Sequence, residues 1–102
     1  MEIHVAFLPQ EAGDMRRRVA VVVDVLRATT SILTLFERGC AEVLVAPTVE
    51  AARRCAAESK MRVRTAGEEG GLPPAGFEFG NSPAAFARAD VSGSRVVIAT
   101  TN

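Results

Sequence analysis

The feature that most constrains the fold is an apolar run over residues 19–23, VAVVV, that ends at a carboxylate, Asp24. Runs this rich in valine are typical of a strand buried on both faces of a parallel sheet. The chain continues through Arg27 into Thr29 and Thr30, where a helix is expected to begin. Open α/β sheets bind their ligands at the carboxyl ends of the strands. The stretch therefore predicts a core strand, a candidate site carboxylate at Asp24 and a cation beside it.

Strand and helix signals alternate along the rest of the chain. Apolar or alternating runs predict strands, and these are residues 2–8, 19–23, 42–46, 61–65 (at a sheet edge) and 95–100. Apolar residues at helical spacing predict helices, and these are residues 28–38, 49–59 and 83–88. The connection over residues 9–18 is too short for a crossover helix, so the first two strands are expected to be antiparallel neighbours.

This alternation marks βαβ units, whose crossovers are almost always right-handed. At 102 residues the chain is expected to be one α/β domain over residues 1–102. The predicted fold class is a layered α/β/α arrangement, with a mostly parallel or mixed sheet of about five strands and about three helices.

Charge and composition exclude several classes of function. Twelve basic and 12 acidic side chains balance, which gives no electrostatic argument for a nucleic-acid partner or an anionic membrane surface. No apolar stretch approaches the ~20 residues of a membrane span, and no signal peptide is visible. Cys40 and Cys55 lack metal-ligand spacing and are expected to be reduced. A cytoplasmic location is therefore expected.

Polar residues follow the apolar strands and the glycine-rich loop in four clusters, which parallel strands would bring to one sheet edge. They are Asp24 with Arg27, Thr29 and Thr30; Glu68 with Glu69; Asn81 with Ser82; and Thr100 with Thr101 and Asn102. Carboxylates suit magnesium (Mg²⁺), and an arginine offers a two-pronged hydrogen-bonding group to phosphate or sulfonate oxygens. Helix starts near Ala28 and Ser82 add backbone amides. Together they predict a site for a small, multiply anionic substrate with a metal ion, and hydrolysis of a phosphate ester fits it.

Each cluster also fits a purely structural role. Asp24 fits a strand end or a helix cap about as well as a site, Arg27 fits a surface cation, and Glu68 with Glu69 fits a solvated loop pair. Capping explains Asn81 and Ser82, and β-propensity explains the two threonines of the last cluster.

Two enzyme classes that also place an Asp after an apolar strand are disfavoured. A nucleotide-binding domain lacks its G-x-x-x-x-G-K-[ST] loop here. A haloacid-dehalogenase-type phosphatase needs a second Asp two residues after the first, and Leu26 stands at that position.

Four strings in this order resemble the 2-phosphosulfolactate phosphatase family. They are D-V-L-R-A-T-T at residues 24–30, Gly67-Glu68, Gly76-Phe77 followed by G-N-S-P at residues 80–83, and A-T-T-N at residues 99–102. The first and third strings are specific together, because no shared compositional reason explains their residue types. The resemblance runs from about residue 19 to the end of the chain.

The resemblance implies a magnesium-dependent phosphatase that converts 2-phosphosulfolactate to sulfolactate and phosphate, a step towards coenzyme M. Asp24 and Glu68 would then be the metal carboxylates, and Arg27 the oxyanion clamp. The implied substrate contacts are Thr29, Thr30, Asn81, Ser82, Thr100, Thr101 and Asn102.

Chains of this family are longer, so this one is expected to be an amino-terminal portion. The alternative is a non-catalytic phosphate- or anion-binding α/β module, or an inactive fragment. The expected partner is a small anionic phospho-acid. A truncated sheet would also expose apolar surface, which makes a homo-oligomer a further expectation.

Overall fold

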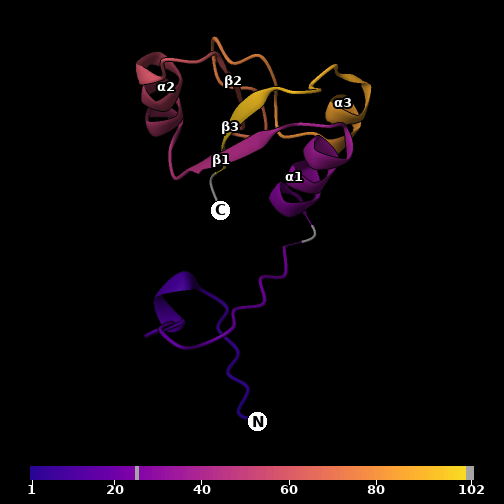
Figure 1. The fold of residues 1–102 in the computed structure, drawn as a ribbon. Helices are drawn as coiled ribbons and strands as arrows, with labels where there is room; N and C mark the ends of the chain where they lie inside the picture. Colours follow the sequence, from indigo (N-terminus) through magenta and orange to yellow (C-terminus); the bar gives the residue numbers. More distant parts are fainter. Residues whose placement is uncertain (25, 101–102) are drawn as a thin grey trace.

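The computed structural model describes residues 1–24 and 26–100 (Figure 1). The elements follow one another as η1 (Pro9–Glu11), α1 (Ala28–Glu37), β1 (Glu42–Ala46), α2 (Val49–Glu58), β2 (Val63–Gly67), α3 (Pro83–Arg88) and β3 (Arg95–Ala99). No helix in the described part of the chain is both long and apolar enough to span a membrane.

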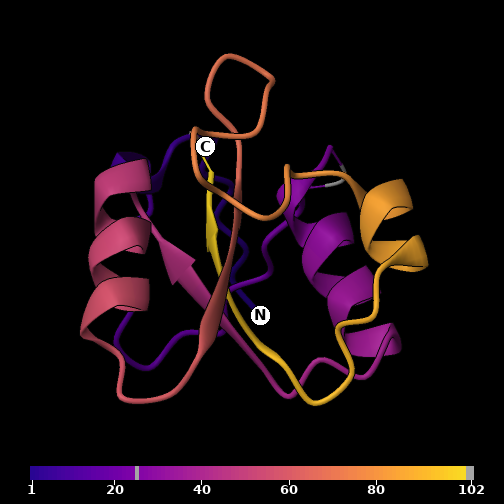
Figure 2. The same ribbon diagram turned by 90° about the horizontal axis from the view of Figure 1, so that it is seen from above.

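The three strands form one parallel sheet in the order β1-β3-β2. Seen from above, α2 lies on one side of the sheet, and α1 and α3 lie together on the other (Figure 2). The three layers confirm the predicted α/β class. The edge position expected for the fourth predicted strand, which is β2, is confirmed as well.

Two apolar clusters hold the layers together, one on each face of the sheet. On the α1 and α3 face, Leu35 and Phe86 pack with Val96 and Ile98 of the central strand. On the α2 face the buried residues are Ala46, Val49, Ala52, Val63, Val97 and Ala99. The central strand β3 therefore contributes side chains to both clusters, as expected for a strand covered on both faces.

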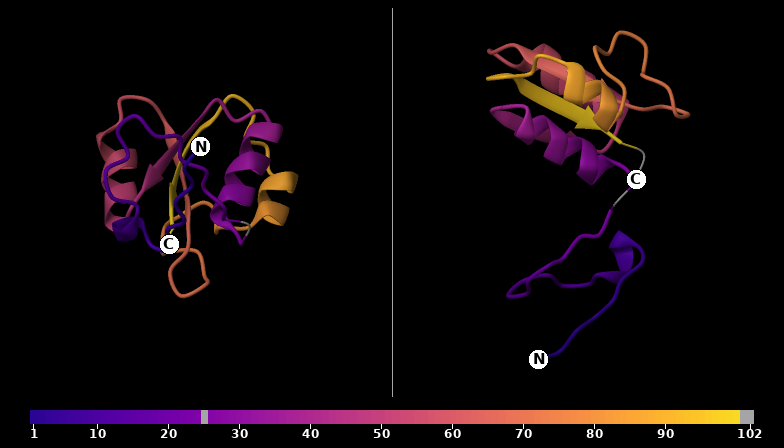
Figure 3. Two further views of the ribbon diagram at one scale, coloured as in Figure 1. Left: turned by 90° about the horizontal axis from the view of Figure 1, so that it is seen from below. Right: turned by 90° about the vertical axis from the view of Figure 1, so that its right-hand side faces the viewer.

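The sheet has three strands in the described residues, where about five were predicted. Residues 2–8 and 19–23 are not strands there: neither segment pairs with the sheet, and their apolar side chains are exposed. Residues 1–23 lie apart from the layered body, which two perpendicular views agree on (Figures 1 and 3). The physical reason is that a strand has no hydrogen bonds within itself, so an apolar run becomes one only where a partner strand lies beside it.

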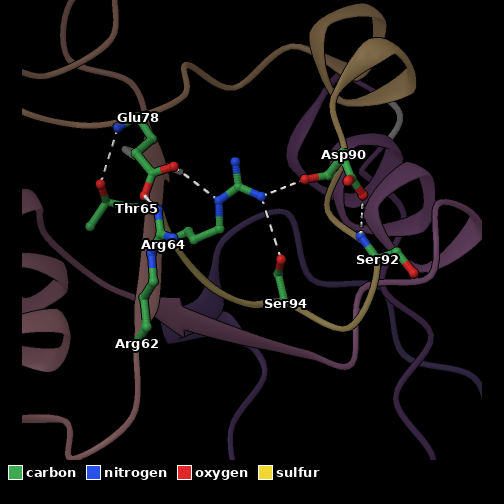
Figure 4. A network of polar contacts seen from close by, with 7 residues as sticks. All are labelled: Arg62, Arg64, Thr65, Glu78, Asp90, Ser92 and Ser94. Carbon is green, nitrogen blue, oxygen red and sulfur yellow. Dashed lines mark hydrogen bonds and ion pairs between the residues drawn. The ribbon is translucent and has the colours of Figure 1, made fainter.

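Arg64 of β2 organises the polar contacts at the amino end of the sheet (Figure 4). Its Nε donates to Glu78 Oε2 at 2.9 Å, and its Nη1 donates to the Asp90 carbonyl at 2.6 Å and to Ser94 Oγ at 3.4 Å. The guanidinium also lies 4.7 Å from the centre of the Phe79 ring. One cation thus ties β2 to the segment before α3 and to the turn before β3, and this holds the charged edge strand in place.

Candidate functional site

The carboxyl ends of the three strands meet at one edge of the sheet, as parallel pairing requires. There they border a hollow of about 190 Å³, lined by Pro47, Thr48, Val49, Glu50, Glu68, Glu69, Ala99 and Thr100. The amino end of α2 opens onto this hollow, and Thr48 caps it by accepting a hydrogen bond from the Ala51 amide at 3.0 Å.

An ion pair at this edge joins Arg27 to Glu68, which are 41 residues apart. Arg27 Nη2 donates to Glu68 Oε2 at 2.7 Å, and the two side chains are 39% and 16% exposed. Glu68 is fixed through its backbone as well, because its amide donates to the Ala99 carbonyl at 3.2 Å. The pair therefore couples the amino end of α1 to the carboxyl ends of β2 and β3.

Asp24 lies half-buried at the amino end of α1, where its Oδ2 accepts a hydrogen bond from the Thr29 amide at 3.4 Å. Asp24 therefore pairs with a free amide of the first turn of α1, although it lies three residues before the N-cap residue Arg27, which makes no side-chain cap of its own. Residues 1–24 and 26–100 contain no cluster of three or more His, Cys, Asp or Glu side chains that could surround a metal ion. Magnesium usually takes only one or two protein carboxylates, and this edge supplies more than that, with Glu50, Glu68 and Glu69 in the hollow and Asp24 at the amino end of α1.

Asn81 and Ser82 lie at the same edge, on the segment beside β2. Phe79 makes a parallel bridge with Ala66 of β2, so Asn81 and Glu68 each follow that bridge by two residues. Asn81 is 3% exposed, and its Oδ1 has no hydrogen-bond partner in the described part of the chain. Ser82 caps α3, since its Oγ accepts from the Ala85 amide at 3.3 Å.

The remaining predicted substrate contacts divide into three groups. Thr100 lines the hollow beside Glu68 and Glu69. Thr29 and Thr30 are first-turn residues of α1, where the Thr29 amide is held by Asp24 and the Thr30 carbonyl accepts from Thr34 Oγ1 at 2.9 Å. Thr101 and Asn102 lie outside the described residues.

Sequence reasoning missed Thr48 and Glu50, which belong to the same hollow. The signal was present, because Pro47 and Thr48 follow β1 just as Glu68 follows β2. The hollow is acidic: Glu50, Glu68 and Glu69 line it, and Arg27 is the cation bonded to one of them. Such a hollow favours a cation, and it admits an anion only together with added positive charge.

Comparisons with known proteins agree on one family. The profile described as 2-phosphosulpholactate phosphatase matches residues 6–102. A probable 2-phosphosulfolactate phosphatase of Deinococcus radiodurans is 51% identical over 84 residues, which are 82% of this chain and 35% of that protein. Probable 2-phosphosulfolactate phosphatases of Thermotoga maritima and of a Synechococcus strain are each 40% identical, over 83% and 100% of this chain. The chain spans between 35% and 43% of the length of these relatives.

Proposed function

The chain belongs to the 2-phosphosulfolactate phosphatase family, and on this premise we propose that it is the amino-terminal part of a magnesium-dependent phosphatase. The reaction proposed is hydrolysis of 2-phosphosulfolactate to sulfolactate and phosphate, in the cytoplasm and on the route to coenzyme M. The observation that carries the proposal is the 2.7 Å pair between Arg27 and Glu68. It joins two of the strings that resemble the family at the edge where α/β sheets bind ligands.

Arg27 is suited to hold the phosphoryl group. A guanidinium has five N–H donors, and the contact with Glu68 uses one of its nitrogens, Nη2. The side chain is 39% exposed, so its other donors can reach a bound oxyanion. In the hydrolysis, a water oxygen bonds to phosphorus, the bond from phosphorus to the ester oxygen breaks, and a proton ends on that oxygen. Arg27 lowers the barrier by neutralising charge on the phosphoryl oxygens.

Asp24 and Glu68 are the residues that would hold magnesium. Glu68 presents a second oxygen, Oε1, which accepts no hydrogen bond from the described residues, and Asp24 likewise uses only Oδ2. When bound, the ion would neutralise phosphate charge and polarise a water. The acidic hollow supports this assignment, because a multiply anionic substrate would otherwise meet three carboxylates there.

The alternative function is a phosphate- or anion-binding module without catalysis. It is favoured by the contact of Asp24 with the Thr29 amide, which engages one carboxylate oxygen with the helix rather than with a ligand. The two functions differ in turnover, since a binding module would retain 2-phosphosulfolactate without releasing phosphate.

The test is phosphate release from 2-phosphosulfolactate, with magnesium and then with a chelator, in the wild type and in Asp24→Asn. We expect release to depend on magnesium and to be largely lost in the variant, because Asp24 is one of the two residues proposed to hold the ion. Glu37→Gln, at the exposed far end of α1, is the matched control and should keep full activity. Metal-independent release, or full activity of Asp24→Asn, would exclude the metal-carboxylate assignment. Substrate binding without release by the wild type would favour the binding module.

A second variant tests whether Arg27 binds the substrate or only stabilises the fold. Arg27→Ala should weaken substrate binding far more than it lowers the melting temperature, because a partly exposed ion pair contributes only ~0–1 kcal/mol to stability. A large drop in melting temperature without a change in affinity would show that Arg27 serves only the structure.

A further inference from the structure

A second hollow lies at the opposite end of the sheet, at the amino ends of β2 and β3. Its volume is about 310 Å³, at the small end of the range for ligand pockets. Arg62, Arg64 and Arg95 line it together with Ser92 and Ser94, so we call it the arginine hollow. No acidic residue of the described chain lines it, whereas three glutamates line the hollow at the carboxyl end. The chain carries no net charge, so this positive charge is local.

The cations at the arginine hollow outnumber the carboxylates that pair with them. Arg62 and Arg64 share one carboxylate, that of Glu78. Arg64 Nε lies 2.9 Å from Glu78 Oε2, whereas Arg62 Nη2 lies 3.6 Å from Oε1, too far for a hydrogen bond. Arg95 pairs with Glu42. Three guanidinium groups thus face two carboxylates, and the positive potential that results favours an anion.

The turn before β3 uses its own polar groups within the fold. Asp90 Oδ1 accepts from the Ser92 amide at 3.3 Å, and the Asp90 carbonyl, not its carboxylate, accepts from Arg64 (Figure 4). The Ser94 amide donates to the Val91 carbonyl at 3.0 Å. The groups that the arginine hollow offers to a ligand are therefore side-chain donors.

Several of these donors have no acceptor among the described residues. Arg64 donates through Nε and Nη1, which leaves the two N–H groups of Nη2. Arg62 donates no hydrogen bond to the described residues, and its side chain is 82% exposed. Ser94 Oγ accepts from Arg64 and keeps its own proton to donate. Guanidinium groups and hydroxyls match the oxygens of a phosphate, and Arg64 is already held in place, which lowers the entropy lost on binding.

We propose that the arginine hollow binds a small phosphate-type dianion, with Arg62 and Arg64 as its ligands, Ser94 as a hydroxyl donor and Arg95 as a further positive charge. The five residues of β2, at ~3.3 Å per residue, separate this site from the proposed phosphatase site by roughly 15 Å. Binding here needs no metal ion, because the arginines supply the positive charge, whereas the acidic hollow admits an anion only with added positive charge. The proposal holds whether or not the chain is a phosphatase.

The test is a titration with inorganic phosphate at a pH where phosphate is a dianion, with a chelator present and the ionic strength held constant with sodium chloride. Binding is followed by two-dimensional ¹H–¹⁵N NMR of the backbone amides and the arginine Nε groups. Arg62→Ala is the main variant, because its exposed side chain can be removed without loss of the fold, which thermal melting checks. Arg54→Ala removes an exposed charge from α2 and is the matched control.

We expect saturable shifts at residues 62–64 and 92–95, with the affinity lowered at least about fivefold in Arg62→Ala and unchanged in Arg54→Ala. Glu78→Gln should raise the affinity about threefold or more, because it removes the competing charge and keeps an acceptor for Arg64. A second titration with glycerol phosphate identifies the source, since tighter binding than that of free phosphate indicates a phosphoryl group carried by an organic molecule.

Four results would overturn the proposal. They are shifts that sodium chloride alone reproduces, shifts confined to the acidic hollow, an affinity in Arg62→Ala equal to that of the wild type, and weaker binding by Glu78→Gln.

Discussion

Gly67 ends β2 directly before Glu68, and its replacement by alanine tests how closely the strands approach at the site. A Cβ built on Gly67 would lie 2.6 Å from the Ala99 carbonyl oxygen, 3.2 Å from the Ala99 Cβ and 3.3 Å from the Ala99 amide nitrogen. The ordinary separation of a carbon and a carbonyl oxygen is about 3.3 Å or more, so β2 and β3 would have to separate by roughly 0.7 Å. All three atoms belong to Ala99, and they cannot move aside easily because the sheet holds the backbone of Ala99 in place.

The cost follows from three contributions. Overpacking of this kind costs about 1–3 kcal/mol. The displaced carbonyl is also the acceptor of the Glu68 amide, and losing that bond costs ~1 kcal/mol. Alanine also restricts the unfolded chain more than glycine does, and this stabilises the folded state by about 0.4–1 kcal/mol. Gly67→Ala should therefore lower the free energy of unfolding by about 2 kcal/mol, and the melting temperature of a domain this size by ~10 °C.

The matched control is Gly80→Ala, on the segment beside β2. A Cβ there would meet a ring atom of Pro73 at 3.2 Å and the Gly67 carbonyl oxygen at an ordinary 3.9 Å. Because the proline ring can move slightly, the free energy of unfolding should change by less than ~0.5 kcal/mol. Urea unfolding followed by circular dichroism measures both variants. Equal losses in the two, or a Gly67→Ala protein as stable as the wild type, would refute the close approach of β2 to Ala99.

Three further predictions concern single side chains. Thr48→Ala should lower the free energy of unfolding by ~1 kcal/mol in the same urea assay, because it removes the cap of α2, whereas Thr48→Ser should retain it. Ser31→Ala should be neutral or stabilising by up to ~1 kcal/mol, because the buried Ser31 hydroxyl has no partner in the described residues; a clear loss would reveal one. The hydrogen bond from Arg95 lowers the pKa of Glu42, so its stabilisation is present above about pH 4.5 and lost as pH falls through the lowered pKa. Melting temperatures from about pH 6 to 3 should then fall more in the wild type than in Glu42→Gln, and parallel curves would contradict this.

The helices were predictable because their signals are local. The range predicted for α3, residues 83–88, is the observed one, since Ser82 caps the helix and Pro83 occupies its first position. For α1 and α2 the predicted ranges end one residue late, at 38 and 59 instead of 37 and 58. In each case capping and apolar spacing lie within a dozen residues of sequence.

Strands were less predictable, because a partner elsewhere in the chain sets their ends. Residues 42–46 were predicted correctly as β1, but β2 begins and ends two residues later than the predicted 61–65. Pairing with Arg95–Ala99 fixes β2 and extends it through Ala66 and Gly67, which carry weak strand signals of their own. Residues 19–23 carry the strongest strand signal in the sequence, yet they are unpaired here. Strand propensity therefore identified the apolar runs but not their pairing.

The location of the candidate site at one edge of the sheet was predictable from the sequence. The contacts between its residues were less predictable. Parallel strands bring Glu68 and Thr100 to one edge, as the sequence indicated. The family resemblance implied separate partners for Arg27 and Glu68, a phosphate and a metal ion, whereas in the structure the two side chains bond to each other. Arg27 cannot give the same N–H to Glu68 and to a phosphoryl oxygen, so a substrate that takes this donor leaves Glu68 uncompensated in an acidic hollow. Positive charge must then reach Glu68 as the anion binds, and the affinity for phosphate should therefore rise with magnesium in the wild type and respond less in Glu68→Gln.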